Sequence, residues 1–433
     1  MNPKPSPNSN PLDPKIVQLE ARLNRLYRAV NQLQRQVNQQ SQLSQPLTPN
    51  FPVASKIGYV GMGFLLGIGL LVSGYWLVSK PYFKAKISDI NKIITRQKPS
   101  TFRSTSAAIQ SQPESQQKLT SEEWIYNVKT LPNFSYNLDL QSIINQVLEE
   151  VQSKGLPTSN FSIHLIDVKT QTFAEYRSQI PRFPASITKL FWMVALYDRV
   201  NQGLLPADAI NYTPECQADI CQLIKKSNNE SASRILDQIT NTSSVPEEQT
   251  KSFEKWLKQR NSINQFFQEA GYKDINISQK NFPIPYINME NPEHWDQKMR
   301  GEETAPIRNV ITAAQTGRLM YEIVTEKAIS KSSSQEMLKL LEQDLAPQVW
   351  QQEESNPIAG FLGEALVDTD VRFASKVGWT SATRFEVAAI TSKDQQVSYI
   401  LTVFGDGTPY AQNEQIFPII SRLVYENMTA TEN

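Results

Sequence analysis

A serine and a lysine one helical turn apart could form a nucleophilic centre near the middle of the chain. Ser186 and Lys189 lie within the segment Phe183–Phe191, after a proline and at the start of an apolar run. In an α-helix, positions i and i+3 lie on the same face, so the serine hydroxyl and the lysine amine can converge. A serine becomes a nucleophile when a base takes its proton, and a lysine with a lowered pKa can be that base. The pair indicates acyl transfer, although this spacing alone also occurs by chance.

Two further polar motifs follow along the chain. The first, Lys226–Ala232, contains Ser227 and Asn229, and the second, Ser375–Thr380, contains Lys376 on a predicted strand. Taken alone, the first motif could simply cap a helix, and Lys376 could be a solvated strand lysine. Together with the first pair, the motifs resemble the ordered signature S-x-x-K, S-D-N, K-T-G of the class A β-lactamase and penicillin-binding serine hydrolase family.

The resemblance, which spans roughly residues 130–428, implies a catalytic role for three side chains. Ser186 resembles the acylated nucleophile, Lys189 its proton-handling neighbour, and Ser227 the residue that relays a proton to the leaving nitrogen. It also implies an oxyanion hole formed by the backbone N–H groups of Ser186 and Trp379.

The same resemblance implies which residues bind the substrate. Asn229 resembles the residue that holds the substrate's amide side chain, and Arg384 the arginine that binds its carboxylate in many class A enzymes. Lys376 would attract this carboxylate and, by like-charge repulsion, lower the pKa of the catalytic lysine. Strand alternation places Lys376 and Gly378 on one face. Outside the family context, Arg384 could instead pair with Glu386 or with solvent.

The sequence departs from the family pattern at two places. Val377 stands where the family has a hydroxyl that helps to bind the carboxylate, and the bulk of Trp379 predicts a poor fit for penicillin-like substrates. The glutamate that activates the deacylating water in true class A β-lactamases aligns with Glu290, with Glu293 as its rival. The surrounding pattern is not that of the family, and a surface glutamate is ordinarily just solvated. The sequence therefore favours acylation and leaves rapid deacylation undecided.

The elements around the motifs predict one domain, residues 126–433, of the α/β (α+β) class. Apolar positions recur at helical spacing from Leu140 to Val151, and Phe161–Val168 with Thr172–Arg177 indicates a hairpin. A mainly helical stretch follows, then three consecutive strands within residues 371–404 and a closing helix. We expect an antiparallel sheet completed from both ends of the domain and flanked by helices, with a mainly helical subdomain beside it.

Residues 1–56 form a polar N-terminal region that contains a predicted coiled coil at residues 15–40. Apolar residues repeat there with heptad spacing: Ile16, Leu19, Leu23, Leu26, Val30, Leu33 and Val37. Branched residues at one seam position and leucines at the other favour a parallel dimer, and hence a homodimer of this chain. The alternative is a single amphipathic helix lying on a membrane or a partner.

Residues 57–79 carry no charge and are long enough to span a bilayer core as one helix. The span is too long, and begins too far into the chain, for a cleaved signal peptide. Residues 80–125, rich in Ser, Thr and Gln towards their end, indicate a flexible linker. The expected architecture is a coiled coil, a single-pass anchor, a linker and the hydrolase domain.

The charges around the span and the implied function predict opposite orientations. Basic residues are concentrated after the span, whereas only Lys56 closely precedes it, and the positive-inside rule would then place the C-terminal domain in the cytoplasm. A β-lactam or peptidoglycan-like substrate, however, lies outside the cytoplasmic membrane of a bacterium. We expect a bacterial inner-membrane protein with its catalytic domain extracytoplasmic, against the charge bias.

The composition gives no support to several other functions. Lys plus Arg and Asp plus Glu both number 43, so the net charge does not suggest a nucleic-acid partner. With two histidines and two cysteines, no metal site is expected, and no cofactor.

His164 shares a strand face with Ile166, which favours a packed core histidine. Cys216 and Cys221 could form a disulfide in an exported domain, but would stay reduced in the cytoplasm.

The sequence leaves three functional hypotheses open. The first is a membrane-anchored serine hydrolase of the class A β-lactamase type that opens β-lactam amides through an acyl-enzyme at Ser186. The second is a peptidoglycan D,D-peptidase-like penicillin-binding protein, which a missing deacylation base would favour. The third is a catalytically silent sensor or scaffold, although a scaffold has no need of so many polar site residues.

Overall fold

The computed structural model describes residues 124–244, 252–285, 288–352 and 356–430. The predicted coiled coil, membrane span and most of the linker lie outside these residues. Within the described ranges, no helix is both long and apolar enough to cross a membrane.

A six-stranded sheet runs through the domain in the order β1-β3-β2-β6-β5-β4. Its neighbouring strands are antiparallel except for β1 and β3, which pair in parallel over two residues. The strands are β1 (Ser135–Tyr136), β2 (Phe161–Asp167), β3 (Thr172–Tyr176), β4 (Val371–Thr380), β5 (Thr383–Ser392) and β6 (Ser398–Asp406). The N-terminal β2 pairs with the C-terminal β6, which confirms a sheet completed from both ends of the domain.

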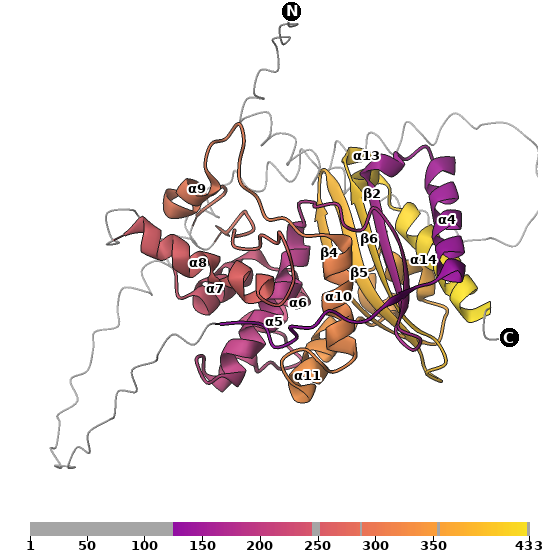
Figure 1. Ribbon diagram of the computed structural model, residues 1–433, viewed down its shortest axis with the longest axis horizontal. Helices are drawn as coiled ribbons and strands as arrows, with labels where there is room; N and C mark the ends of the chain where they lie inside the picture. Colours follow the sequence, from indigo (N-terminus) through magenta and orange to yellow (C-terminus); the bar gives the residue numbers. More distant parts are fainter. Residues whose placement is uncertain (1–123, 245–251, 286–287, 353–355, 431–433) are drawn as a thin grey trace, which may run out of the picture. The chain divides into compact units, whose positions relative to one another are not determined.

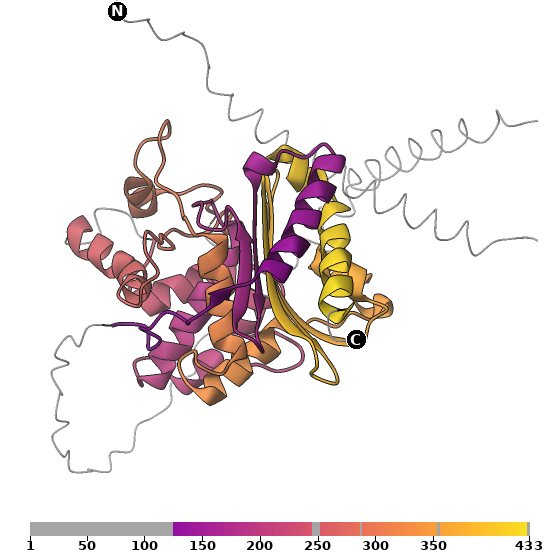
Figure 2. The same ribbon diagram turned by 45° about the vertical axis from the view of Figure 1, so that its right-hand side comes forward.

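Two helices from opposite ends of the domain cover one face of the sheet. These are α4 (Leu138–Ser153) and α14 (Ile416–Ala430), which lie side by side in Figures 1 and 2. The Asn137 side chain caps α4 by accepting from the N–H groups of Asp139 and Leu140. Three short elements belong to the same side: η1 (Thr158–Asn160), η6 (Leu362–Leu366) and α13 (Thr408–Gln412).

The remaining helices lie on the opposite face and form the helical subdomain (Figure 1). Helix α10 (Ala313–Val324) packs directly on β2, β5 and β6. The others are η2 (Ala185–Ile187), α5 (Thr188–Asn201), η3 (Ala207–Ile210), α6 (Asp219–Ile224), α7 (Asn229–Thr240), α8 (Phe253–Gln268), α9 (His294–Arg300) and α11 (Lys331–Leu341). The short α12 (Pro347–Trp350) leads back towards β4.

Strand alternation divides the core into two layers. On β5, Phe385 and Val387 pack among the helices of the subdomain, whereas Ala388 and Ile390 pack towards α4 and α14. Helix α5 is buried on nearly all sides, from Thr188 to Asp198. Ser186 therefore lies just before a helix that the core surrounds on nearly all sides.

Candidate active site

Ser186 lies in a short 3₁₀ turn that leads directly into α5, rather than inside the α-helix that the sequence predicts. Ile187 donates its N–H to Pro184 O at 3.1 Å, and the Thr188 hydroxyl donates to Ala185 O at 3.0 Å. Ala185 adopts a left-handed backbone with φ of 48°, which is costly for a residue other than glycine and is typical of functional sites. The turn leaves the Ser186 side chain half-buried.

Lys189 is fully buried and lies at the centre of the candidate site. Its Nζ is 3.0 Å from Ser186 Oγ, 3.3 Å from Ser227 Oγ and 2.8 Å from Asn229 Oδ1. It also donates to the carbonyl of Ser227. The structure thus brings together the four polar groups that the first two motifs supply.

The Ser227 and Asn229 side chains are available for this cluster because another residue caps α7. The cap is Asn228, whose side chain accepts from Ser231 N at 2.9 Å. Ser227 has a left-handed backbone with φ of 51°, so the chain reverses direction at this point. The interpretation of Ser227 and Asn229 as simple capping residues is therefore wrong.

Lys376, on β4, joins the cluster from the other side. It is buried, and its Nζ is 3.1 Å from Ser227 Oγ and 2.9 Å from its neighbour's carbonyl, Val377 O. Ser227 Oγ therefore lies within hydrogen-bond distance of both lysines, Lys189 and Lys376. A hydroxyl between two amines can pass a proton from one side of the site to the other.

Burial lowers the pKa of both lysines, so each amine loses its proton more easily than a solvated lysine does. Burial, and then the Lys376 ammonium, hold the pKa of Lys189 well below its ordinary value. Burial lowers the pKa of Lys376 to about 7, against the opposing effect of the Glu386 carboxylate. The lowered pKa favours the neutral amine of Lys189, which is the form that can act as a base.

Gly378 lets β4 closely approach the 3₁₀ turn Ala185–Ile187, which holds the candidate nucleophile Ser186 and is called the nucleophile turn below. A Cβ at this position would lie 2.6 Å from Pro184 O, 2.9 Å from an Ile187 side-chain carbon and 3.1 Å from Ile187 N. Real Cβ atoms do not approach backbone oxygen so closely, so a larger residue would push the strand and the turn apart. Glycine at this point of β4 therefore fixes the distance between Lys376 and Ser186.

Arg384 and the Trp379 side chain lie on the opposite face of the sheet from Lys376. The two residues are paired across β4 and β5, whereas Lys376 pairs with Val387. Arg384 is buried, and its guanidinium donates to the carbonyls of Gly360, Tyr410 and Ala411. The structure does not bring the Arg384 side chain to the Ser186 cluster.

The Trp379 indole is turned away from the nucleophile for the same reason. Its Nε1 donates to Ala411 O at 3.0 Å, and the Arg384 guanidinium lies 5.5 Å from its ring centroid. The bulk of Trp379 is therefore no reason to expect a poor fit for penicillin-like substrates, because strand alternation sends the side chain to the other face.

Glu290 does not lie with the cluster. It is exposed, and no hydrogen bond or ion pair within the described ranges joins it to Ser186 or Lys189. The side chain that reaches the nucleophile turn from this part of the chain is Asn281, whose Nδ2 donates to Ala185 O at 3.2 Å. Sequence reasoning missed Asn281 because no local motif marks it and only the tertiary fold brings it to the turn.

His164 is a core residue, as the sequence predicts. It is 4 % exposed, its ring lies 5.6 Å from that of Phe173, and burial lowers its pKa to about 4. A Cβ at Gly317 of α10 would come within 2.8 Å of its Nδ1, so helix and strand are in close contact here. This histidine has no link to the Ser186 cluster.

Cys216 and Cys221 form a disulfide with a Cα–Cα distance of 5.2 Å. Only Cys221 belongs to α6; Cys216 lies in the preceding turn with φ of 54°, so the divergence expected on one regular helix does not arise. Gln222 donates to Cys216 O and accepts from Asn228 N at 3.0 Å. The disulfide therefore supports the turn that carries Ser227.

We expect the disulfide to contribute about 2 kcal/mol to the stability of the domain, as the loop-entropy argument gives for so short a loop. Replacing Cys216 and Cys221 with serine should lower the free energy of unfolding in urea by this amount. Reductant should lower that of the wild-type domain equally, and should leave the double variant unchanged. Equal stability of the reduced and oxidised wild-type domain would contradict the prediction.

Known proteins were compared with this chain at the level of family and fold. The family model described as the Beta-lactamase enzyme family matches residues 139–428. The search of curated proteins gives no match.

Three solved structures illustrate the similarity. The β-lactamase of Sphaerobacter thermophilus DSM 20745 is 17 % identical, with a TM-score of 0.46 over 67 % of this chain and 98 % of that one. PBP-A is 18 % identical, with a TM-score of 0.45 over 70 % and 99 %. The class A β-lactamase of the last common ancestor of Gram-negative bacteria is 16 % identical, with a TM-score of 0.45 over 66 % and 98 %. Because the family model covers well over half of the 433 residues, the chain belongs to the Beta-lactamase enzyme family.

Proposed function

We propose that this protein is a membrane-anchored serine hydrolase that opens penicillin-like amides by forming an acyl-enzyme on Ser186. The observation that carries the proposal is the buried Lys189 amine, within 3.0 Å of Ser186 Oγ and 3.3 Å of Ser227 Oγ. Acyl transfer needs a base within hydrogen-bond distance of both the attacking hydroxyl and a hydroxyl that can relay the proton, and Lys189 meets this requirement. A scaffold would gain nothing from burying two lysines beside a hydroxyl.

In the proposed acylation, neutral Lys189 takes the Ser186 proton as Oγ attacks the carbonyl carbon. The new C–O bond forms and the carbonyl oxygen becomes an oxyanion, stabilised by the backbone N–H groups of Ser186 and Trp379. The proton then passes from Lys189 through Ser227 to the amide nitrogen, and the C–N bond breaks. Asn229 and Lys376 hold the amide and the carboxylate of the substrate.

We infer that deacylation is slow, so the protein acts in the manner of a penicillin-binding protein rather than a fast β-lactamase. Glu290 is exposed, and the loop beside the nucleophile presents the Asn281 amide. A neutral amide cannot take a proton from water as a carboxylate can. This observation also favours a peptidoglycan D,D-peptidase as the second candidate function.

The test is a reporter cephalosporin whose ring opening changes its colour, mixed with the full chain in detergent. We expect a burst equal to the protein concentration, followed by a much slower steady rate. Rapid turnover with no burst would contradict slow deacylation while leaving acylation itself in place. Glu290→Gln should leave both phases unchanged, because we assign it no part in the reaction.

The proposed location is the outer side of a bacterial inner membrane. The Cys216–Cys221 disulfide supports it, because disulfides persist in oxidising compartments and are rare in the cytoplasm. A single cysteine placed in the linker, in a chain whose native cysteines are replaced, should react with an impermeant maleimide in intact spheroplasts. Reaction only after permeabilisation would contradict this orientation.

The affinity for an anionic substrate should fall as the pH rises above about 7. Lys376 binds a carboxylate only when protonated, and burial lowers its pKa in the free enzyme to about 7. The measurement is the second-order rate constant for acylation by a penicillin as a function of pH. On the alkaline side this rate constant should fall, approaching tenfold per pH unit.

Two controls separate this effect from general alkaline damage. The methyl ester of the same penicillin has no carboxylate and should show no such fall. Lys376→Arg, whose guanidinium stays protonated, should move the fall well above pH 9. An identical alkaline fall for acid and ester would show that another group causes it.

A further inference from the structure

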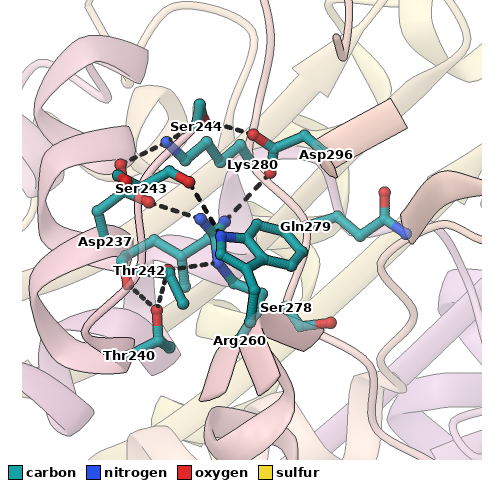
Figure 3. A network of polar contacts seen from close by, with 12 residues as sticks. Asp237, Thr240, Thr242, Ser243, Ser244, Arg260, Ser278, Gln279, Lys280 and Asp296 are labelled. Carbon is teal, nitrogen blue, oxygen red and sulfur yellow. Dashed lines mark hydrogen bonds and ion pairs between the residues drawn. The ribbon is translucent and has the colours of Figure 1, made fainter. Parts of the chain in front are cut away.

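A second polar cluster lies in the helical subdomain and contains three buried ion pairs (Figure 3). It joins Asp237 of α7, Arg260 of α8, Asp296 of α9 and Lys280, which follows α8 in an irregular stretch. The side chains of Arg260 and Lys280 are 0 % exposed, and those of Asp237 and Asp296 are 17 % and 4 % exposed. We call these four residues the buried charge cluster.

Asp237 is the central acceptor of the buried charge cluster. Its Oδ2 lies 2.5 Å from Lys280 Nζ, and its Oδ1 lies 2.5 Å from Arg260 Nη2. Arg260 also reaches Asp296 Oδ1 at 3.3 Å. Ser244 accepts from Lys280 Nζ at 2.7 Å and donates to Asp296. Figure 3 shows both cations pointing towards Asp237 from different segments.

Stability alone does not account for such a cluster. Taking four charges out of water costs several kcal/mol per ion, and apolar side chains of similar volume often stabilise a fold as well or better. What an ion network does supply is fixed geometry, because it is satisfied in only one arrangement of its donors and acceptors. The question is therefore which parts of the molecule it fixes.

The cluster joins the two segments that meet at Ser186. Helix α7, which carries Asp237, begins at Asn229 beside Lys189. Lys280 immediately precedes Asn281, whose Nδ2 donates to Ala185 O, the carbonyl next to the nucleophile. The Lys280–Asp237 pair thus links the helix that begins at Asn229 to the loop that contacts Ala185.

The Asn309 side chain holds the backbone of the loop, residues 278–285, at Gln279, the residue before Lys280. Asn309 accepts from Gln279 N at 2.9 Å and donates to Gln279 O at 2.7 Å. Beyond Gln279, the Lys280 side chain is the next link to the helical subdomain. Its loss should leave the Gln279 anchor in place and let Asn281 move.

We infer that Lys280 and Asp237 are positioning residues for acylation, which hold Asn281 and the Ser186 turn in register with the relay from α7. This inference rests on the proposed function for its effect on acylation rate. Its structural half is the statement that the ion pair fixes the 278–285 loop. This statement does not depend on the proposed function and can be measured without any substrate.

The test compares Lys280→Met with the double variant Lys280→Met/Asp237→Asn in the full chain. The single variant leaves a buried carboxylate short of one partner, so it should lower both the melting temperature and the acylation rate with a fluorescent penicillin. We expect acylation about 10- to 100-fold slower, as a displacement near 1 Å can cause. The double variant removes both charges and leaves Arg260 with Asp296, so its melting temperature should recover while its acylation stays slow.

A matched control is Arg318→Met, which breaks another buried ion pair, Arg318–Glu322 on α10. The other hydrogen bonds of Arg318 are to the carbonyls of Val128 and Ala270, and its guanidinium lies 4.0 Å from the centroid of the Tyr272 ring. It should lower the melting temperature and leave the acylation rate of the folded protein within about twofold. Acylation that recovers together with stability in the double variant, or a wild-type rate in Lys280→Met, would overturn the inference.

Hydrogen exchange separates a failure of the inference from a failure of the proposed function. Peptides covering residues 278–285 should exchange faster in both Lys280 variants than in the wild type and in Arg318→Met. If the wild-type chain forms no adduct, the proposed function fails, and faster exchange in this loop still supports the structural half. Unchanged exchange in Lys280→Met overturns the inference, whether or not the chain reacts with penicillin.

Discussion

Replacing Lys189 with methionine should lower the acylation rate at least 1,000-fold and leave the domain folded. The side chain is fully buried, and its amine is the only basic group within 3.0 Å of Ser186 Oγ among the described contacts. A positioned base contributes about 10²- to 10⁴-fold, and in the proposed mechanism the same amine also starts the relay through Ser227. The expected loss is therefore at the upper end of that range.

Folding should survive because methionine matches lysine in length and removes a buried amine. The loss of hydrogen bonds to the Ser227 carbonyl and Asn229 Oδ1 costs about 1–3 kcal/mol, and the relief of desolvation offsets part of it. Circular dichroism and urea unfolding check the fold, and gel fluorescence with a labelled penicillin gives the rate.

Lys189→Arg is the control for charge and size. Its guanidinium keeps hydrogen-bond donors near Ser186 but cannot give up its proton, so this variant should be about as slow as the methionine variant. If either variant acylates within tenfold of the wild type, Lys189 is not the base.

Replacing Gly378 with alanine should slow acylation about 100-fold with only a modest loss of stability. The added Cβ would meet backbone atoms of the nucleophile turn, Pro184 O and Ile187 N, which cannot move aside as a flexible side chain can. The strand or the turn must shift, and a displacement near 1 Å of a reacting group costs about this much. Lys376 and the Trp379 N–H would move with the strand.

Gly363→Ala is the matched control for Gly378→Ala. Its Cβ would also make contacts near 3 Å, but with the side chains of Ile358 and Phe373 on the other face of the sheet. It should lower the melting temperature and leave the acylation rate of the folded protein unchanged. Equal rates for Gly378→Ala and the wild type would contradict the account of β4.

The sheet and the motif-bearing elements could be predicted from the sequence because their signals are local. Period-two alternation gave Phe161–Val168 as a strand, and the structure has it at Phe161–Asp167. The short motifs carry their own spacing, so Ser186, Lys189, Ser227 and Lys376 were found without any knowledge of distant contacts. The structure then brings all four together.

The sequence failed where a role depends on the face of a strand or on a loop. Arg384 was expected to bind a carboxylate, but its place opposite Trp379 sends it to the other face, against the Tyr410 and Ala411 carbonyls. Asn281 was missed because its contact with Ala185 joins residues 96 apart. The expectation for Glu290 rests on its distance along the sequence from a later segment, and a loop of different length changes which residue lies at that distance.

The central claim is covalent acylation of Ser186, and the most direct measurement maps the adduct. The full chain in bacterial membranes is incubated with a penicillin and digested with trypsin, which cleaves after Arg182 and Lys189. The account predicts the mass of the intact penicillin on the peptide Phe183–Lys189 in the wild type, and no adduct in Ser186→Ala. An adduct on another peptide, equal labelling of the alanine variant, or an unmodified wild-type peptide would contradict it.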